Sequence, residues 1–273
     1  MDDILDAHAL TKRYRRATVL DDVSITIAAG TIHGLLGPNG SGKTTCLHLI
    51  TGLLAPDDGT AIVGGVDVAS PASRRLFGFA PDDLPLPGAL TGREYLALHD
   101  ALRGRDDRAR ASELGELLRI DDALERPVGD YSHGMRRKLQ LVAAVMHDPL
   151  LLVLDEPFRG LDPESAIALR ALLVAFARSG RAVLVATHDL LRAERDCAEV
   201  TILDRGAVVA AGPPTALLAS RPGAATLDDV FLEVTGRAAD AGRRLARLDA
   251  VFARTPSHPG IPRPDQPDTE STP

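Results

Sequence analysis

Residues 37–45 combine glycines, a lysine and two threonines in the pattern of a loop that binds phosphate. They read Gly-Pro-Asn-Gly-Ser-Gly-Lys-Thr-Thr. Glycine tolerates positive φ, so the backbone can lie close against a phosphate with several N–H groups turned toward it. The lysine adds a point charge for the outer phosphates, and a threonine hydroxyl is a suitable ligand for Mg²⁺. The expected phosphate contacts are Gly37, Pro38, Asn39, Gly40, Ser41, Gly42, Lys43, Thr44 and Thr45.

The residues on either side of this loop supply the structural context that such a motif requires. Residues 32–36 are an apolar run typical of a buried strand, and residues 45–54 have the composition of a helix. The positive end of that helix would add its partial charge to the phosphate site. A chance match is the alternative, but the four defining positions recur in only about one in a hundred chains of this length. Strand, glycine loop and helix together therefore favour nucleotide binding.

Two adjacent carboxylates could complete the chemistry of a nucleotide site. Asp155 and Glu156 follow a second apolar run, residues 151–154, which predicts a buried strand ending in two acids. Beside the phosphate loop, Asp155 could hold Mg²⁺ through water. Glu156 would then be placed to polarise the water that attacks the γ-phosphate. An ordinary strand end capped by acids is the alternative interpretation.

Three further segments carry a resemblance to a known family. Residues 131–135 read Tyr-Ser-His-Gly-Met before an arginine-rich helix, which resembles the signature motif of ATP-binding cassette proteins, usually Leu-Ser-Gly-Gly-Gln. Gly-Leu-Asp follows the carboxylates at residues 160–162, and His188 ends a further apolar run at residues 182–186. The order and spacing of these motifs agree with the family pattern over about residues 6–204. The chain therefore resembles the ATPase subunits of ABC transporters, with ATP and Mg²⁺ as ligands.

The resemblance implies roles for individual residues of one chain. Tyr14 lies where the family places an aromatic side chain that stacks on adenine, although a plain surface tyrosine is the alternative. Thr44 and Asp155 would organise Mg²⁺, and Glu156 would be the catalytic glutamate. His188 resembles the histidine that contacts the γ-phosphate, with a buried structural histidine as the alternative.

The resemblance also implies that two copies of the chain enclose two ATP molecules. Ser132, His133 and Gly134 would contact the γ-phosphate held by the opposite copy, and Asp162 belongs to the loop that crosses the dimer interface. The residues support this arrangement independently, because a second helix start is expected near Met135. Such a helix end is a second anion site, far along the chain from residues 37–45.

Two positions depart from the family pattern. Asp82 stands where most members carry a glutamine that contacts Mg²⁺ and links ATP to the helical subdomain. Aspartate cannot donate a hydrogen bond when ionised, so we expect Asp82 to keep a switching role near the metal without the direct contact. His133 replaces the first glycine of the signature pair. This signature and residues 229–236 resemble the corresponding segments of family members that export drugs, polysaccharides or other hydrophobic cargo.

The organisation of the chain agrees with a P-loop NTPase (RecA-like) core of class α/β. We expect a mostly parallel sheet, an antiparallel β subdomain and an inserted helical subdomain at about residues 84–146, all within an ATP-binding domain of residues 1–215. A strand is expected at residues 74–80 and a closing hairpin at residues 200–210. Residues 216–254 predict a C-terminal helical extension, and the proline-rich residues 255–273 predict disorder.

Composition limits the possible partners and the cellular location of the protein. A net charge of −7 argues against a nucleic-acid partner, and Cys46 and Cys197 lack metal-ligand spacing. No transmembrane run or signal peptide is expected, so the predicted location is the cytoplasmic face of the plasma membrane, on an integral-membrane permease. The alternative is a soluble ABC-type ATPase with a non-transport role. A regulatory GTPase is disfavoured because its Asn-Lys-x-Asp segment is absent.

Overall fold

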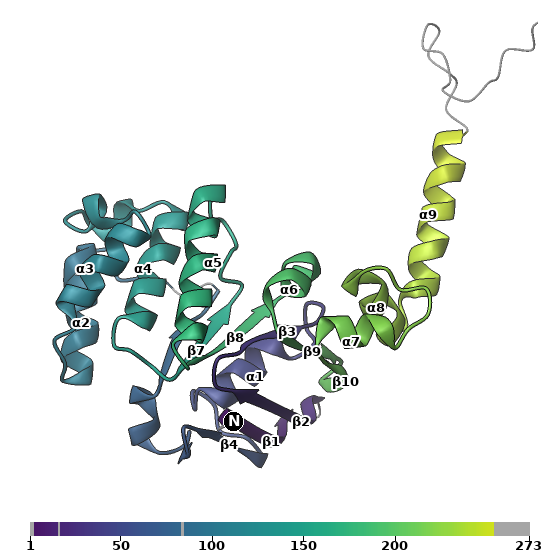
Figure 1. Cartoon of the computed structure of the whole chain (residues 1–273), viewed down its shortest axis with the longest axis horizontal. Helices are drawn as coiled ribbons and strands as arrows, with labels where there is room; N and C mark the ends of the chain where they lie inside the picture. Colours follow the sequence, from purple (N-terminus) through teal and green to yellow (C-terminus); the bar gives the residue numbers. More distant parts are fainter. Residues whose placement is uncertain (1–2, 16, 83–84, 254–273) are drawn as a thin grey trace, which may run out of the picture.

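A six-stranded, mostly parallel sheet runs through the centre of the protein (Figure 1). The computed structural model describes residues 3–15, 17–82 and 85–253. The strand order is β10-β9-β3-β8-β7-β6, and only the edge strand β10 is antiparallel to its neighbour. The strands are β3 (Ile32–Leu36), β6 (Phe77–Ala80), β7 (Leu151–Asp155), β8 (Ala182–Thr187), β9 (Glu199–Asp204) and β10 (Ala207–Gly212).

Both faces of this sheet are buried, as continuous apolar strands require. In β7, Leu152 and Leu154 join one hydrophobic core, whereas Leu151 and Val153 join the other. The alternation follows from the two-residue period of a strand. The carboxyl ends of β7 and β8 carry the acidic and histidine candidates, so the parallel register brings these residues to one edge of the sheet.

One face is covered by a helix and a second sheet. The antiparallel sheet has the order β2-β1-β4-β5, and it shares a core with α1 that includes Leu5, Leu47 and Leu184. Its hairpin β1–β2 pairs Tyr14 with Ala17. The elements are β1 (Asp3–Tyr14), β2 (Ala17–Ala28), β4 (Asp58–Val63), β5 (Val66–Asp67) and α1 (Lys43–Ile50).

Helices cover the other face and form the helical subdomain on the left of Figure 1. The subdomain begins with a capping box, in which Thr91 and Glu94 exchange hydrogen bonds, and its first helix ends at the left-handed Gly104. The subdomain helices are α2 (Gly92–Arg103), α3 (Arg108–Leu117) and α4 (His133–Val145). Outside the subdomain, α5 (Pro163–Arg178) covers the same face of the sheet. Within the described residues, no helix is both long and apolar enough to span a bilayer.

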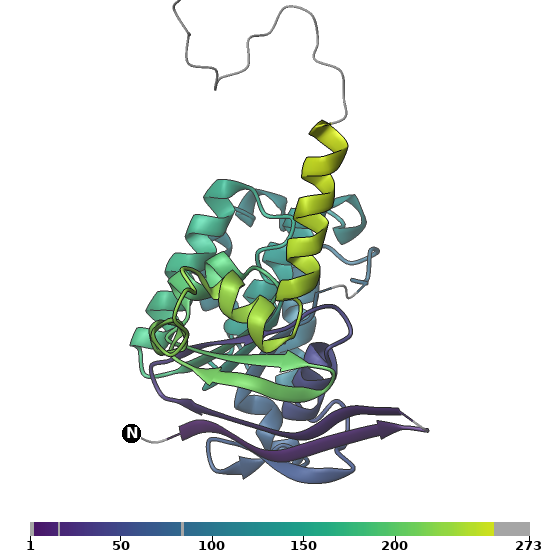
Figure 2. The ribbon, with the colours of Figure 1, turned by 90° about the vertical axis from the view of Figure 1, so that its right-hand side faces the viewer.

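The C-terminal part follows the predicted hairpin of β9 and β10. Three helices come after it, and the last one extends away from the rest of the molecule (Figures 1 and 2). They are α7 (Pro214–Ala219), α8 (Leu227–Val234) and α9 (Ala238–Ala253), while α6 (Leu190–Asp196) lies earlier, between β8 and β9. The predicted tail of residues 255–273 lies outside the described residues.

Three predicted boundaries were wrong. The helix expected at residues 45–54 is α1, Lys43–Ile50, and turns follow it. The strand expected at residues 74–80 begins only at Phe77, because the segment before it forms a 3₁₀ turn, Pro71–Arg75, after the N-cap Ser70. The helix expected to start near Met135 begins at His133, because the Ser132 side chain caps it by accepting a hydrogen bond from the Met135 N–H at 3.2 Å.

Candidate active site

The phosphate loop joins β3 to α1 in a shape that only glycine tolerates at two positions. Gly42 is the N-cap of α1 with φ 107°, and a Cβ there would lie 2.6 Å from Leu20 Cδ2. Gly40 has φ 78°, a left-handed value, although its side-chain position is open. Gly42 offers no side-chain cap, so the first N–H groups of α1 remain available to an anion.

The side chains of the loop fit a bound phosphate chain. Lys43 Nζ donates to the carbonyl oxygens of Gly37 at 2.7 Å and Pro38 at 3.2 Å, and among the described residues no carboxylate pairs with this buried ammonium. Burial lowers the pKa of Lys43, and the charges of Glu156 and Asp155 oppose that shift. Ser41 Oγ is buried with no hydrogen-bond partner, which a phosphate oxygen would supply.

Thr44 and Asp155 meet across the loop and the end of β7. Thr44 Oγ1 donates to Asp155 Oδ2 at 3.1 Å. Burial raises the pKa of Asp155, as do Asp82 and Glu156, whereas Thr44 and Lys43 lower it. A hydroxyl and one carboxylate suit Mg²⁺, which keeps several waters and is completed by phosphate oxygens. The described part of the chain holds no group of three or more His, Cys, Asp or Glu that could bind a metal ion.

Glu156 is held by three donors at the end of β8. Its Oε1 accepts from the His188 backbone N–H at 3.0 Å and lies 2.6 Å from His188 Nδ1, while its Oε2 accepts from Thr187 Oγ1 at 2.9 Å. An ionised carboxylate can only accept, so Nδ1 carries the proton of this contact. Glu156 has φ 47°, and such a strained non-glycine conformation persists where surrounding contacts enforce it.

Asp82 lies near this site but its carboxylate already has a partner. Arg159 Nη1 donates to Asp82 Oδ2 at 2.6 Å, which ties the end of β6 to the segment that follows Glu156. Asp82 also contributes to the raised pKa of Asp155, after burial and opposed by Thr44, so the two acids are close. Arg159 was not singled out by the sequence analysis.

The buried Arg137 joins the ends of two strands. Its guanidinium donates to the carbonyl oxygens of Pro81 and Asp82 after β6 and of Asp155 at the end of β7. The side chain is only 2% exposed, and burial lowers its pKa. Sequence analysis grouped Arg137 with neighbouring basic residues, so its role was missed. The only feature of the sequence that could have indicated this role is the position of Arg137 at the start of the largely apolar, buried stretch of α4.

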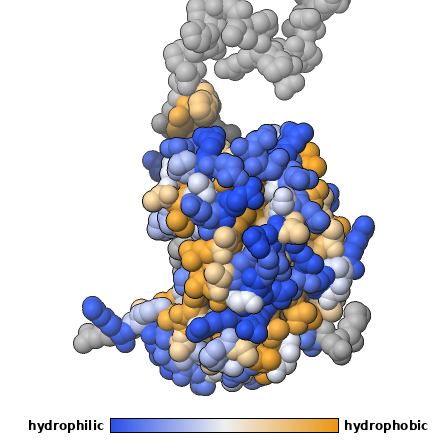
Figure 3. All heavy atoms as spheres, turned by 90° about the vertical axis from the view of Figure 1, so that its left-hand side faces the viewer, coloured by the Kyte–Doolittle hydropathy of each residue, from blue (hydrophilic) through white to orange (hydrophobic). Residues whose placement is uncertain are grey.

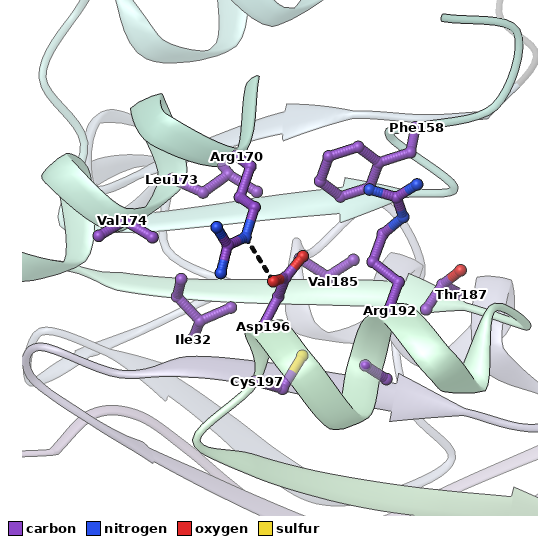
Figure 4. Close-up of a pocket in the computed structure, with 11 residues that line it drawn as sticks. Ile32, Phe158, Arg170, Leu173, Val174, Val185, Thr187, Arg192, Asp196 and Cys197 are labelled. Atoms are coloured by element: carbon purple, nitrogen blue, oxygen red, sulfur yellow. Dashed lines mark hydrogen bonds and ion pairs between the residues drawn. The ribbon is translucent and has the colours of Figure 1, made fainter. Parts of the chain in front are cut away.

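A stacked pair of side chains, Phe158 and Arg192, also holds the segment that follows Glu156. The Arg192 guanidinium lies against the Phe158 ring (Figure 4). It is 4.1 Å from the ring centroid. Arg192 belongs to α6, the helix that follows His188, so the pair connects the loop after β7 to α6. Nearby, Arg170 Nε donates to Asp196 at 2.5 Å and joins α5 to α6 (Figure 4).

The signature segment packs against the chain after Glu156. A Cβ on Gly160 would lie 2.5 Å from His133 Cδ2, so the two residues are in contact. Ser132 caps α4, and Asp162 caps α5 by accepting from the Ser165 N–H at 2.9 Å. Among the described residues, no hydrogen bond or ion pair joins residues 37–45 to residues 132–134.

Tyr14 lies at the end of the β1–β2 hairpin and is 47% exposed. The hairpin reaches the phosphate loop, because Leu20 and the Val19 carbonyl oxygen of β2 adjoin Gly42. Lys12 Nζ lies 5.8 Å from the centroid of the Tyr14 ring. The exposed ring therefore belongs to the sheet that borders the phosphate site.

Comparison with known proteins agrees with this geometry. The sequence matches the family described as ABC transporter over residues 20–159. The chain belongs to the ABC transporter family. Within that family it is an ATP-binding subunit, as its relatives and solved neighbours are.

Relatives of this ATP-binding subunit include proteins named for export and drug resistance. It is 39% identical to the daunorubicin resistance ATP-binding protein DrrA2 of Streptomyces coeruleorubidus, over 77% of this chain and 67% of the relative. It is 36% identical to the Nod factor export ATP-binding protein I of Burkholderia orbicola, over 80% of this chain and 74% of the relative. The doxorubicin resistance ATP-binding protein DrrA of Mycobacterium tuberculosis is also 36% identical, over 90% of this chain and 73% of that protein.

Solved structures confirm the expected α/β cassette fold. A structure titled as the ATP binding subunit of an ABC transporter superposes with a TM-score of 0.80 at 32% identity, covering 85% of this chain and 99% of the other. A nucleotide-free ATP-binding cassette from an ABC transporter has a TM-score of 0.71 at 23% identity, with 84% and 99% covered, which supports the fold alone.

Proposed function

We propose that this ATP-binding subunit hydrolyses ATP with Mg²⁺ and thereby drives a separate membrane permease. The observation that carries the proposal is the meeting of three strand ends at the phosphate loop. Thr44 contacts Asp155, and the next residue, Glu156, is held by Thr187 and His188. The residues proposed to hold the cation and to act as general base therefore lie next to each other beside the proposed phosphate loop, which supports the proposal.

Within this site, the chain's own residues position reactants and stabilise charge. Backbone N–H groups of the phosphate loop and the Lys43 ammonium would bind the outer phosphates. Glu156 would accept a proton from the attacking water, and the donors on Thr187 and His188 orient its carboxylate for that task. Mg²⁺, when bound at Thr44 and Asp155, supplies positive charge that offsets the charge developing on the phosphates. Tyr14 would stack on the adenine base.

Two copies of the chain would complete each site. The N-terminus of α4 at Ser132, His133 and Gly134 is a second helix end suited to an anion. It packs on Gly160 of its own chain, and within the described residues it forms neither a hydrogen bond nor an ion pair with residues 37–45. A γ-phosphate bound by a partner copy would supply the missing anion, with Asp162 near the shared interface.

The partner in the membrane would contact the helical subdomain. Leu98 and Leu102 of α2 are exposed apolar side chains, and the face shown in Figure 3 mixes hydrophobic with hydrophilic surface. The relatives named for drug resistance and Nod factor export support an exporter. The subunit would then work at the cytoplasmic face of the plasma membrane, with residues 1–215 as its ATP-binding domain and residues 216–254 as a C-terminal extension.

The decisive experiment measures the specific rate of ATP hydrolysis as the concentration of the purified chain rises. A rate that climbs with concentration, and that is lost in Glu156→Gln, is the expected result for a site shared by two copies. A measurable rate that does not depend on protein concentration would refute the shared site. No hydrolysis and no MgATP binding at any concentration would refute the proposed activity itself.

A further inference from the structure

The turn between β9 and β10 lies between the phosphate loop and the hairpin that carries Tyr14. The Gly206 N–H donates to the Ser41 carbonyl oxygen at 3.0 Å, and the Gly206 carbonyl oxygen accepts from the Asp21 N–H at 2.9 Å. Gly206 has φ 83°, and a Cβ there would lie 2.4 Å from the Val19 carbonyl oxygen, so the position favours glycine. A shift of this turn would therefore displace backbone on two sides of the proposed nucleotide site.

The end of β9, which leads into this turn, also approaches the phosphate loop. A Cβ on Gly37 would lie 2.4 Å from the Leu203 carbonyl oxygen. Successive side chains of a strand face opposite sides, so Leu203 joins the core around α1, whereas Val200 and Ile202 pack against the C-terminal helices. Asp204 follows on the side of Ile202, and this carboxylate is only 9% exposed.

Arg237 is the close partner of this buried carboxylate. It lies in the link between α8 and α9, and its Nη2 donates to Asp204 Oδ1 at 2.9 Å. Among the described residues, Asp204 has one other ion pair, with Arg205, whose Nε is 3.9 Å from Oδ2 and whose side chain is 88% exposed. A buried carboxylate is costly without a partner, and a solvated arginine at that distance compensates little. Arg237 therefore holds Asp204, and with it the end of β9.

The C-terminal helices do not depend on this ion pair for their attachment. Leu217 of α7 and Leu227 and Val230 of α8 are buried in one core with the side chains of β9. Glu194 of α6 also accepts a hydrogen bond from the Leu227 N–H at 2.7 Å. Burial of several apolar side chains outweighs one partly exposed ion pair. Removing the charge of Arg237 should therefore loosen the turn and leave the helices in place.

We propose that Arg237 is a positioning residue for the nucleotide site, which acts through Asp204 and the β9–β10 turn on Ser41 of the phosphate loop. Without the ion pair, a nucleotide would have to order a looser loop, and its affinity would fall. The coupling is reciprocal, so a bound nucleotide would strengthen the tie between the turn and the C-terminal helices. This inference rests on the proposed function, because it requires a nucleotide at the phosphate loop.

The test measures trinitrophenyl-ATP binding with Mg²⁺ by fluorescence, in a Glu156→Gln background so that hydrolysis does not interfere. Arg237→Gln should raise the dissociation constant about two- to fivefold, the size expected for one partly exposed ion pair. Arg237→Lys keeps the charge and should restore most of the affinity. The effect should vanish beside Asp204→Asn, because a neutral amide needs no cationic partner. Arg243→Gln, which removes an ion pair confined to α9, is the matched control and should change nothing.

A second measurement needs no nucleotide. Hydrogen–deuterium exchange in the Arg237→Gln variant should quicken in peptides that contain residues 203–207 and residues 37–45, and stay unchanged in the helical subdomain. Faster exchange confined to the C-terminal helices would overturn the proposal, as would an unchanged dissociation constant or an equal rise beside Asp204→Asn. Failure of the parent subunit to bind the nucleotide would instead refute the proposed function, and the exchange measurement separates the two cases.

Discussion

The Glu156 carboxylate and the His188 imidazole meet at 2.6 Å, between Oε1 and Nδ1, at the ends of two adjacent parallel strands. The His188 backbone N–H donates to the same oxygen, so one residue orients the acid twice. The imidazole is 66% exposed and leaves its second nitrogen free to face a ligand. This hydrogen bond joins Glu156, the proposed base, to His188, the residue proposed to contact the γ-phosphate.

Replacing either residue should slow hydrolysis while nucleotide binding persists. Glu156→Gln keeps the shape but removes the base, so we expect a loss of about 100-fold or more in kcat. His188→Ala keeps the base but removes its orienting ring, and a smaller loss of about 10-fold is expected. Steady-state kinetics beside an ATP-binding assay measure both effects. A Glu156→Gln variant that hydrolyses ATP at the parent rate would disprove the assignment.

Ser132 has two separable roles, as a helix cap and as a proposed phosphate contact. Ser132→Asn and Ser132→Asp both retain a capping oxygen for α4, so their melting temperatures should stay close to that of the parent. Only aspartate places a negative charge against the partner copy's phosphate, and we expect it to hydrolyse ATP about 10-fold more slowly than the asparagine variant. Equal rates for the two variants would argue that no phosphate approaches Ser132.

Arg137 should matter for stability more than its exposed neighbour. Arg137→Met leaves the carbonyl oxygens of Pro81, Asp82 and Asp155 without their shared donor, at an expected cost of about 2–4 kcal/mol in the free energy of unfolding. Arg136→Met, on the exposed side of the same helix, should cost less than about 1 kcal/mol. Urea denaturation compares the two, and similar costs would contradict the proposed tie between strands.

The buried His33 should make the protein sensitive to acid. Burial lowers the pKa of His33 from 6.5 to about 4, and its Nε2 lies 2.9 Å from Thr201 Oγ1. The folded state then binds fewer protons than the unfolded state between these values. Stability is therefore lost as the pH falls through that window, by at most about 3 kcal/mol.

Substitution tests this origin of the acid sensitivity. His33→Gln should reduce the decline in unfolding free energy between pH 6.5 and pH 4 without abolishing it. Glutamine does not titrate, but burial also lowers the pKa of His99 and His147 to about 4. His8→Gln, at an exposed position of β1, serves as the control and should retain the parent slope. Parallel slopes for the parent and His33→Gln would show that other groups cause the decline.

The local patterns of the sequence were sufficient to predict the strand before Asp155, a helix after residues 37–45 and a helix near Met135, although not the exact bounds of the two helices. Glycine spacing and continuous apolar runs act over a few positions, so they can be recognised without knowing the fold. The same patterns misplaced the boundaries at Phe77, at His133 and of α1, because turns and caps there compete with the simple periodicity.

The contacts between distant segments were decided only by the tertiary structure. Asp82 and Arg159 are separated by most of the helical subdomain, and Arg137 binds carbonyl groups that leave no trace in residue type. The parallel order of β6, β7 and β8 brings these groups to one edge of the sheet. Which side chains then meet depends on strand order and burial, and these are properties of the whole packed chain that no short segment of sequence encodes.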